Sequence, residues 1–328
     1  MRAPRLPSHT WRPLRREDAA PLHRLELACA PLDGGTNLAT IADLSARLDE
    51  TGTRLTTDTL CLVDPTGELA ASAWVTCDEG LRHQFRFFLD GRVHPQCRGR
   101  GLGSFVLQWM ESRASEMLSE LNEARPGVLR IDFYDRADDA MALFERQGFR
   151  FAFAEDEMWR DLSQPLPALE VPDGMDLVTW SPRSTALFFE AYQDSFRERP
   201  GFPHWSEEVW CHNYSGGASF RADLSVLLLE GGDPVGYAIS HVETGAVGWI
   251  VQMGVRPAWR HQGLGAALLC EVMRRFQDEG LRWAALEVNV DNDRAFRLYQ
   301  RLRFERRTRH TSYQKPLGSH SMRDGANP

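Results

Sequence analysis

The chain has 328 residues and is 42% hydrophobic and 26% charged, which allows two domains of ordinary size, each with its own apolar core. Its net charge of −8 argues against nucleic acid or an anionic membrane as the main partner, and no apolar run reaches the ~18 residues that a membrane span needs. Six cysteines without a Cys-x-x-Cys pair indicate reduced thiols in a cytoplasmic protein, and their spacing predicts no metal site.

The first half of the chain predicts a strand, two helices and three strands, followed by a helix, a strand, a helix and a final strand. The assignment rests on apolar periodicity and on the turn residues between the periodic runs. The ranges are 9–16, 17–27, 41–50, 59–63, 69–76, 84–93, 103–123, 128–134, 138–147 and 149–162.

A proline-rich stretch without periodicity follows at 163–174, and we interpret it as a linker between domains 1–162 and 175–317. After the linker the same order of elements starts again. The polar tail 318–328 is expected to be disordered. The predicted ranges of the second half are 175–180, 185–196, 206–214, 224–229, 234–243, 249–253, 266–276, 282–290, 293–303 and 304–315.

Each half contains a glycine loop between an apolar strand and a predicted helix. The second loop, 255–266, has Gly263 and Gly265, which let a ligand approach the main chain, and it opens a helix whose N-terminus favours negative charge. A single Gly-x-Gly is more often a tight turn into a helix. The first loop, 93–103, repeats the order Val-x-Pro and then Arg-x-x-Gly-x-Gly, so the repetition indicates two phosphate cradles.

Both loops resemble the acetyl-CoA loop of the GCN5-related N-acetyltransferase (GNAT) family, whose pattern is Gln/Arg-x-x-Gly-x-Gly/Ala after a Val-x-Pro strand end. The resemblance covers nearly the whole chain as two tandem copies. It implies an α/β (α+β) fold class with two tandem GNAT folds, each a mixed, mostly antiparallel sheet that is splayed at the acetyl-CoA site and has helices on both faces.

The resemblance also implies acetyl-CoA as the cofactor, held by the loops and by the main chain of the strands that precede them. Charge from Arg260 and His261 would add to this near the phosphates, although a solvated turn residue is an equal reading of Arg260. The implied cofactor residues are Val93, Arg98, Gly99, Arg100, Gly101, Leu102 and Gly103 in the first copy, and Met253, Gly254, Val255, Arg260, His261, Gln262, Gly263, Leu264, Gly265, Ala266, Asn292 and Tyr299 in the second.

Tyr299 is the candidate that protonates the departing thiolate. It ends a run that resembles the family's Asn-x-x-Ala-x-x-x-Tyr pattern, and a phenol with a pKa near ~10 is a close match to a thiol leaving group. Asp291 or Asn292 is expected to cap this helix, and Asn292 can also reach the pantetheine amide. Spacing alone favours a core position for Tyr299, whereas the glycine loop upstream favours the acid.

The first half lacks this phenol. Aligning Phe149 with Phe304 pairs Tyr299 with Phe144 and Asn292 with Ala137. Phenylalanine fills the same space and carries no transferable proton. We therefore interpret the first domain as a degenerate copy that either binds acyl-CoA without turnover or serves as a scaffold.

The general base is less well defined by the sequence. Glu287 lies inside an apolar strand, which favours it slightly over His241 and Glu243 at the end of a hairpin strand. Each of the three also fits a polar group that faces water, and ordered water would serve without any of them. Aromatic residues between 196 and 214 predict either an acceptor pocket or packing between two helices.

These features predict an acetyl-CoA-dependent N-acetyltransferase that acts on a primary amine, preferably of a small molecule, by direct attack in a ternary complex in the second domain. The tandem arrangement is distantly similar to mycothiol synthase, but that group carries a glutamate base where this chain has Trp249. The alternatives are a non-catalytic acyl-CoA-binding or assembly protein and a protein acetyltransferase for lysines or N-termini. We expect a monomer that acts as an internal pseudo-dimer, or a weak homodimer.

Overall fold

The computed structural model describes residues 3–35, 39–49, 54–78, 83–135, 137–199, 202, 204–243 and 246–318. The chain forms two compact units: unit 1 contains residues 1–154 and 310–328, and unit 2 contains residues 155–309. Within the described ranges, no helix is long and apolar enough to cross a membrane, and no group of three or more His, Cys, Asp or Glu side chains is placed to hold a metal ion. Most of the predicted tail, 319–328, lies outside these ranges.

Unit 1 has a sheet with the strand order β1-β2-β3-β4-β5-β12, in which β4 and β5 are parallel and the other neighbours are antiparallel. Its strands are β1 (Thr10–Arg12), β2 (Thr59–Val63), β3 (Leu69–Asp78), β4 (Phe85–Val93), β5 (Gly127–Tyr134) and the second part of β12 (Glu305–Leu317). Its helices are α1 (Ala19–Asp33), α2 (Ile41–Asp49), α3 (Leu55–Asp58), α4 (Leu102–Leu121) and α5 (Asp138–Arg146). The single turn of α3 is too short for periodicity to predict it.

Unit 2 repeats this pattern with the order β6-β11-β10-β9-β8-β7, and here β10 and β11 form the parallel pair. Its strands are β6 (Arg150–Asp161, second part), β7 (Met175–Thr179), β8 (Val226–Glu230), β9 (Asp233–Glu243), β10 (Val247–Val255) and β11 (Trp283–Asn289). Its helices are α6 (Thr185–Phe196), α7 (Glu207–Ser215), α8 (Leu264–Asp278) and α9 (Asp293–Arg301).

The strand that ends each half of the chain pairs within the other compact unit. Residues 155–161 of β6 pair with β11, and residues 310–317 of β12 pair with β5. The halves 1–162 and 175–317 thus describe the repeat along the chain, whereas the compact units exchange their terminal strands. Apolar periodicity predicts a strand but not the strand it pairs with, so the sequence alone does not predict this exchange.

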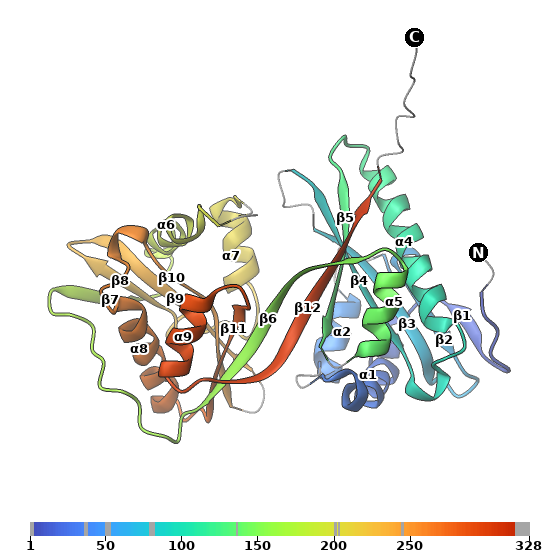
Figure 1. Ribbon diagram of the computed structural model, residues 1–328, viewed down its shortest axis with the longest axis horizontal. Helices are drawn as coiled ribbons and strands as arrows, with labels where there is room; N and C mark the ends of the chain where they lie inside the picture. The colour runs from blue at the N-terminus through green and yellow to red at the C-terminus, as the bar shows by residue number, and fades with distance from the viewer. Residues whose placement is uncertain are drawn as a thin grey trace, which may run out of the picture. The chain divides into compact units, whose positions relative to one another are not determined.

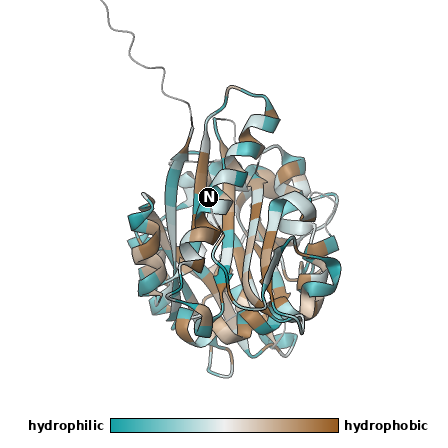
Figure 2. Ribbon diagram, turned by 90° about the vertical axis from the view of Figure 1, so that its right-hand side faces the viewer, coloured by the Kyte–Doolittle hydropathy of each residue, from teal (hydrophilic) through white to brown (hydrophobic). Residues whose placement is uncertain are grey.

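Each sheet has an apolar core on both faces, as the prediction of helices on both sides requires. In unit 2, α8 and α9 cover one face and α6 and α7 the other (Figure 1). In unit 1, α4 and α5 pack against one face, and α1 and α2 against the opposite one. Figure 2 shows apolar residues recurring along the strands, with hydrophilic residues spread over the flanking helices.

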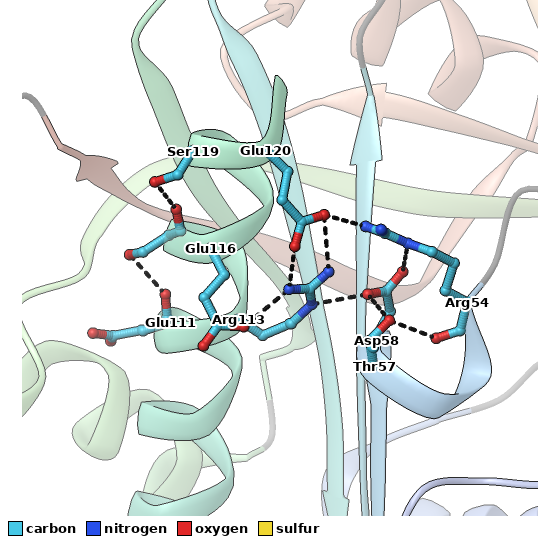
Figure 3. A network of polar contacts seen from close by, with 9 residues as sticks. Arg54, Thr57, Asp58, Glu111, Arg113, Glu116, Ser119 and Glu120 are labelled. Carbon is cyan, nitrogen blue, oxygen red and sulfur yellow. Dashed lines mark hydrogen bonds and ion pairs between the residues drawn. The ribbon is translucent and has the colours of Figure 1, made fainter. Parts of the chain in front are cut away.

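A buried ionic network ties α3 to α4 in unit 1 (Figure 3). Arg113, whose side chain is 7% exposed, donates from Nε to Asp58 at 2.8 Å and from Nη1 to Glu116 and Glu120 at 2.9 and 2.8 Å. Arg54 completes the network through Glu120 at 2.6 Å. Hydrogen bonds from Arg113 and then Arg54 lower the pKa of Glu120 to about 2. The network fixes α4, the helix that the first glycine loop opens.

The parallel strands separate in both units just before the glycine loop. β10 pairs with β11 only from Val247 to Ile250, although it stays paired with β9 as far as Val255. β4 likewise pairs with β5 only over Phe85–Phe88 and with β3 as far as Val93. Each unit therefore has the predicted mixed, mostly antiparallel sheet with a splay at the strand that leads into the loop.

Candidate functional site

The loop before α8 presents a run of open backbone amides. α8 begins at Leu264, and its N-cap, Gly263, has φ 81° and provides no side-chain cap. His261 has φ 68°, in the left-handed region that costs a non-glycine residue roughly 1–2 kcal/mol. The amides of residues 261–265 find no acceptor among the described residues. Together with the helix dipole they form a site suited to an anionic group.

Unit 1 has the same loop geometry. Gly99 and Gly101 have φ 73° and 78°, and α4 begins directly after them at Leu102. Gly99 thus occupies the strained position that His261 holds in unit 2. The amides of residues 99–103 likewise have no acceptor in the described part of the chain. Both loops therefore have the same backbone conformation and open amides, and their role as phosphate cradles stays a prediction.

The arginine of each loop is engaged inside its own unit. Arg260 donates from Nε to the Val255 carbonyl at 3.0 Å and from Nη2 to the Ser195 carbonyl at 2.8 Å. Arg98 bonds the Val93 carbonyl at 3.1 Å and pairs with Asp33 at 2.8–2.9 Å. Each arginine ties the end of the splayed strand to the end of the first helix. The part of Arg260 in binding phosphate stays a prediction.

The splay leaves the β11-facing edge of β10 open between residues 251 and 255. The last pair with β11 is Ile250 with Leu286, whereas the β9 side stays paired to the end of the strand. Met253, Gly254 and Val255, whose main chain was predicted to bind the pantetheine, lie on this open stretch. Gly254 permits close packing of α6, because a Cβ atom there would lie 2.6 Å from Cβ of Ser195.

A β-bulge in β10 distinguishes unit 2 from unit 1. The pairing of β10 with β9 shifts by one residue between Ile250 and Gln252, whereas the β3–β4 register runs without interruption. Just after the bulge, Oε1 of Gln252 accepts hydrogen bonds from Trp210 Nε1 at 2.9 Å and from Tyr237 Oη at 2.7 Å. Neither feature was predicted. The available signal was a lone polar residue within the apolar run 249–253.

Tyr299 lies on α9 with 7% of its surface exposed, and its ring is 5.9 Å from that of Phe304. Burial raises its pKa to about 12. Its hydroxyl makes no hydrogen bond to any described residue, so the proton is not committed within the chain. Tyr299 is thus a core side chain, and its role as the acid stays a prediction. Asn292 caps α9 by accepting from the Ala295 amide at 3.2 Å.

Phe144 occupies the position of Tyr299 in unit 1. The Phe149 amide bonds the Phe144 carbonyl at 3.0 Å, and the Phe304 amide bonds the Tyr299 carbonyl at 2.9 Å. The ring of Phe144 is 6.4 Å from that of Phe149. Ala137 is the N-cap of α5 and makes no side-chain cap, in contrast to Asn292. The backbone thus supports the alignment on which the missing phenol was inferred.

Gly265 lies where the strand end, the loop and α9 converge. A Cβ atom at this position would be 3.6 Å from Cδ2 of Leu298, the neighbour of Tyr299, and 3.9 Å from Cγ2 of Val255. The second loop therefore lies next to the end of β10 and to α9, the helix that carries the predicted acid Tyr299.

The three base candidates differ in their surroundings. Glu287 is exposed on β11, just beyond the last residue that pairs with β10, and its partner across the strand pair is Glu157 of β6. His241 has both nitrogens occupied, with Nε2 2.7 Å from the Tyr214 carbonyl and Nδ1 3.1 Å from the Ser219 hydroxyl. Since a carbonyl only accepts, Nε2 carries the proton, and His241 is held as a structural residue. Glu243 is half-buried at the end of β9.

The aromatic residues between 196 and 214 belong to a packed core. Trp210 is fully buried and stacks on Tyr192 with ring centroids 5.2 Å apart. Phe202, Trp205 and Tyr214 pack against the same cluster. Of the two predicted roles, packing between helices is the one that the contacts of these side chains support.

Comparison with known proteins gives matches over most of the chain. Residues 185–304, within unit 2, match the model of the Acetyltransferase (GNAT) family. A mycothiol acetyltransferase of Nocardiopsis dassonvillei is 40% identical over 250 residues, which cover 65% of this chain and 69% of the relative. A mycothiol acetyltransferase of Thermobispora bispora is 29% identical over 232 residues, which cover 68% of this chain and 74% of the relative.

Solved structures match the whole fold. A GCN5-related N-acetyltransferase from Sphaerobacter thermophilus aligns with a TM-score of 0.81 and 29% identity, covering 96% of this chain and 97% of its own. A tandem GNAT protein from the clavulanic acid biosynthesis pathway aligns with a TM-score of 0.71 and 17% identity, covering 95% of this chain and 100% of its own. The second likeness is one of fold alone.

Proposed function

Because the chain belongs to the GNAT family of acetyltransferases, we propose that unit 2 transfers the acetyl group of acetyl-CoA to the primary amine of a small molecule. The observation that carries the proposal is the meeting of open loop amides, a splayed strand edge and a buried phenol in one unit. The names of the mycothiol acetyltransferase relatives support a small-molecule acceptor.

The residues of unit 2 fit an acyl-CoA. The amides of residues 261–265 are suited to bind a pyrophosphate, because they combine unpaired N–H groups with a helix N-terminus. The open edge of β10 offers main-chain N–H and C=O groups to the amides of a pantetheine chain. Acetyl-CoA, when bound, supplies an acyl group activated as a thioester, and the chain supplies binding, charge stabilisation and the movement of protons.

Main-chain N–H groups on the open stretch of β10 are suited to stabilise negative charge on the acyl oxygen as an amine attacks. Such donors stabilise the transition state strongly when they are fixed in advance and shielded from water. The bulge at Val251 and the latch by Arg260 fix this stretch. Glu287, exposed beside the splay, removes the proton of the amine through water.

Tyr299 donates to the departing sulfur. With its pKa raised to about 12, the phenol stays protonated at neutral pH. Full transfer of its proton to a thiolate is uphill, because the thiol has the lower pKa, near ~8.5 in water. The phenol therefore stabilises the thiolate mainly through a hydrogen bond, rather than through the balanced proton transfer that an unperturbed phenol would give.

The residues of unit 1 fit a role other than catalysis. It has the loop amides and the splay, but Phe144 in place of the phenol and no bulge in β4. We therefore assign it acyl-CoA binding without turnover, or a scaffolding role alone.

Isothermal titration calorimetry with acetyl-CoA tests both assignments. Gly265→Trp and Gly103→Trp place the same bulky side chain at the equivalent position after each loop, and circular dichroism checks the fold of each variant. We expect Gly265→Trp to abolish a binding site and the release of coenzyme A in the presence of amines. Loss of a further site in Gly103→Trp identifies unit 1 as a binding unit, and no loss identifies it as a scaffold. Absence of binding by the wild type contradicts the proposal.

A further inference from the structure

Gln252 lies on β10 where this strand has separated from β11. It follows the bulge at Val251 and is the second residue of β10 beyond the last pair with β11. Its side chain faces α6 and α7, since it bonds residues of that core, whereas α8 with its open amides packs on the opposite face. A cofactor whose phosphates lie at α8 leaves the α6–α7 side of the splay to the acceptor.

The amide of Gln252 is fixed by two buried donors. Oε1 accepts from Trp210 Nε1 at 2.9 Å and from Tyr237 Oη at 2.7 Å, and both donor residues are fully buried. An amide oxygen has two lone pairs, so its accepting capacity is used, and the two donors determine which end of the amide is the oxygen. Burial raises the pKa of Tyr237 well above its usual value, which keeps its hydroxyl protonated as a donor.

The nitrogen end of the same amide is uncommitted. Nε2 carries two N–H donors, and neither bonds any residue within the described ranges. In unit 1 the corresponding residue is Asp90, whose carboxylate pairs with Arg47 at 3.0 Å and with Arg92 at 2.7 Å. Unit 1 thus has a satisfied ion pair at the position where unit 2 presents two available donors.

We propose that Nε2 of Gln252 donates a hydrogen bond to an oxygen atom of the acceptor, so that unit 2 selects primary amines with a hydroxyl or carbonyl oxygen close to the amine. The oxygen must be close, because the main chain suited to the acyl oxygen begins one residue away and a strand advances ~3.3 Å per residue. Trp210 and Tyr237 are positioning residues for this contact. The inference rests on the proposed function of unit 2.

The test compares acceptors that differ by an oxygen. Release of coenzyme A from acetyl-CoA is measured with ethanolamine against propylamine and with glycinamide against isobutylamine, pairs of matched size. The value of kcat/KM is calculated for the unprotonated amine, because a nearby oxygen lowers the pKa of the amine. On this basis we expect the wild-type value to be about tenfold higher for the oxygen-bearing member of each pair, the size of one hydrogen bond. Gln252→Met retains the length of the side chain without N–H donors and should reduce each ratio to about one, with the Kd of acetyl-CoA unchanged.

Two further variants separate recognition from structure. Gln193→Met makes the same change at an exposed site on α6 and should leave the ratios at the wild-type value. Tyr237→Phe removes one anchor of the amide and should lower the ratios while transfer to propylamine persists, which keeps the test valid if Gln252→Met fails to fold.

The outcomes separate the role of Gln252 from the proposed transferase activity of unit 2. Equal rates for both members of each pair in the wild type, or unchanged ratios in Gln252→Met, overturn the role of Gln252 and leave the transferase intact. Binding of acetyl-CoA without transfer to any of the four amines contradicts the proposed function, and the inference with it.

Discussion

At the residue scale, one difference between the two units is the hydroxyl oxygen of Tyr299, which Phe144 lacks. Tyr299 and Phe144 share the same backbone hydrogen bonds and nearly the same burial, so the packing of their helices does not depend on the hydroxyl. The hydroxyl of Tyr299 makes no hydrogen bond to a described residue, so it is free to donate one to a ligand.

The substitution Tyr299→Phe is therefore expected to lower kcat about 100-fold or more, with the Kd of acetyl-CoA and the melting temperature little changed. The expectation follows from the usual contribution of a positioned proton donor. Steady-state kinetics and calorimetry provide the two values. Tyr313→Phe, the same change at a buried tyrosine of unit 1, serves as the control and should retain wild-type kcat. A similar loss in both variants, or none in Tyr299→Phe, would assign the phenol to packing.

At the scale of elements, the sequence was sufficient wherever a pattern was long. Apolar periodicity predicted the strands that lead into both loops and the helices that follow them, and the repeated Arg-x-x-Gly-x-Gly located both cradles. The alignment on Phe149 and Phe304 identifies Phe144 in the place of Tyr299. These features are local, and the residues that determine them are close together in the chain.

Other parts of the site depend on contacts that no local pattern encodes. The bulge at Val251 adds one residue to a strand, and its trace in the sequence is only Gln252 within an apolar run. The donors that hold Gln252 come from α7 and β9. Arg260 was read as a turn residue or a phosphate ligand, because the Ser195 carbonyl that it bonds is far away in the chain. His241 is likewise held by the carbonyl of Tyr214, a contact between distant parts of the chain that the sequence does not predict.

The network of Figure 3 makes α4 a good element for a stability test. Arg113→Met removes the buried cation and leaves the carboxylate of Asp58, 5% exposed, without its main partner. Breaking a buried pair from one side costs about 3–5 kcal/mol of unfolding free energy. Urea denaturation followed by circular dichroism measures the loss.

Arg54→Met is the comparison, since its side chain is 56% exposed and pairs with Glu120 at 2.6 Å and, at a longer 3.5 Å, with Asp58. An exposed pair contributes about 0–1 kcal/mol, so the loss should be at least threefold smaller than for Arg113→Met. Equal losses for the two variants would show that burial does not govern the energetics of this network.

At the scale of the whole molecule, the exchange of terminal strands determines which parts of the chain can fold. Unit 2 needs residues 155–161 from before the linker, and unit 1 needs residues 310–317 from the end of the second half. Each of these strands supplies seven or eight paired residues to the sheet that receives it. The covalent linker at 163–174 is therefore only one of the connections between the halves.

A protease site inserted at position 168 tests this view. After complete cleavage, the fragments should elute together in gel filtration, retain a cooperative unfolding transition and separate only in urea, because each unit still contains strands of both fragments. The uncleaved protein with the same insertion is the control. Separation of the fragments in native buffer would contradict the exchange of strands.

The exchange of terminal strands also determines whether one half of the chain can be deleted without harm to the other. A duplicated domain that has lost its chemistry can usually be deleted without harm to its twin. Here a deletion of the first half would also remove the strand that completes the sheet of unit 2, and a deletion of the second half would remove the strand that completes the sheet of unit 1. Each half has become a structural prerequisite of the other. The first half of the chain is thus retained through residues 155–161 of β6, whether or not unit 1 carries out chemistry.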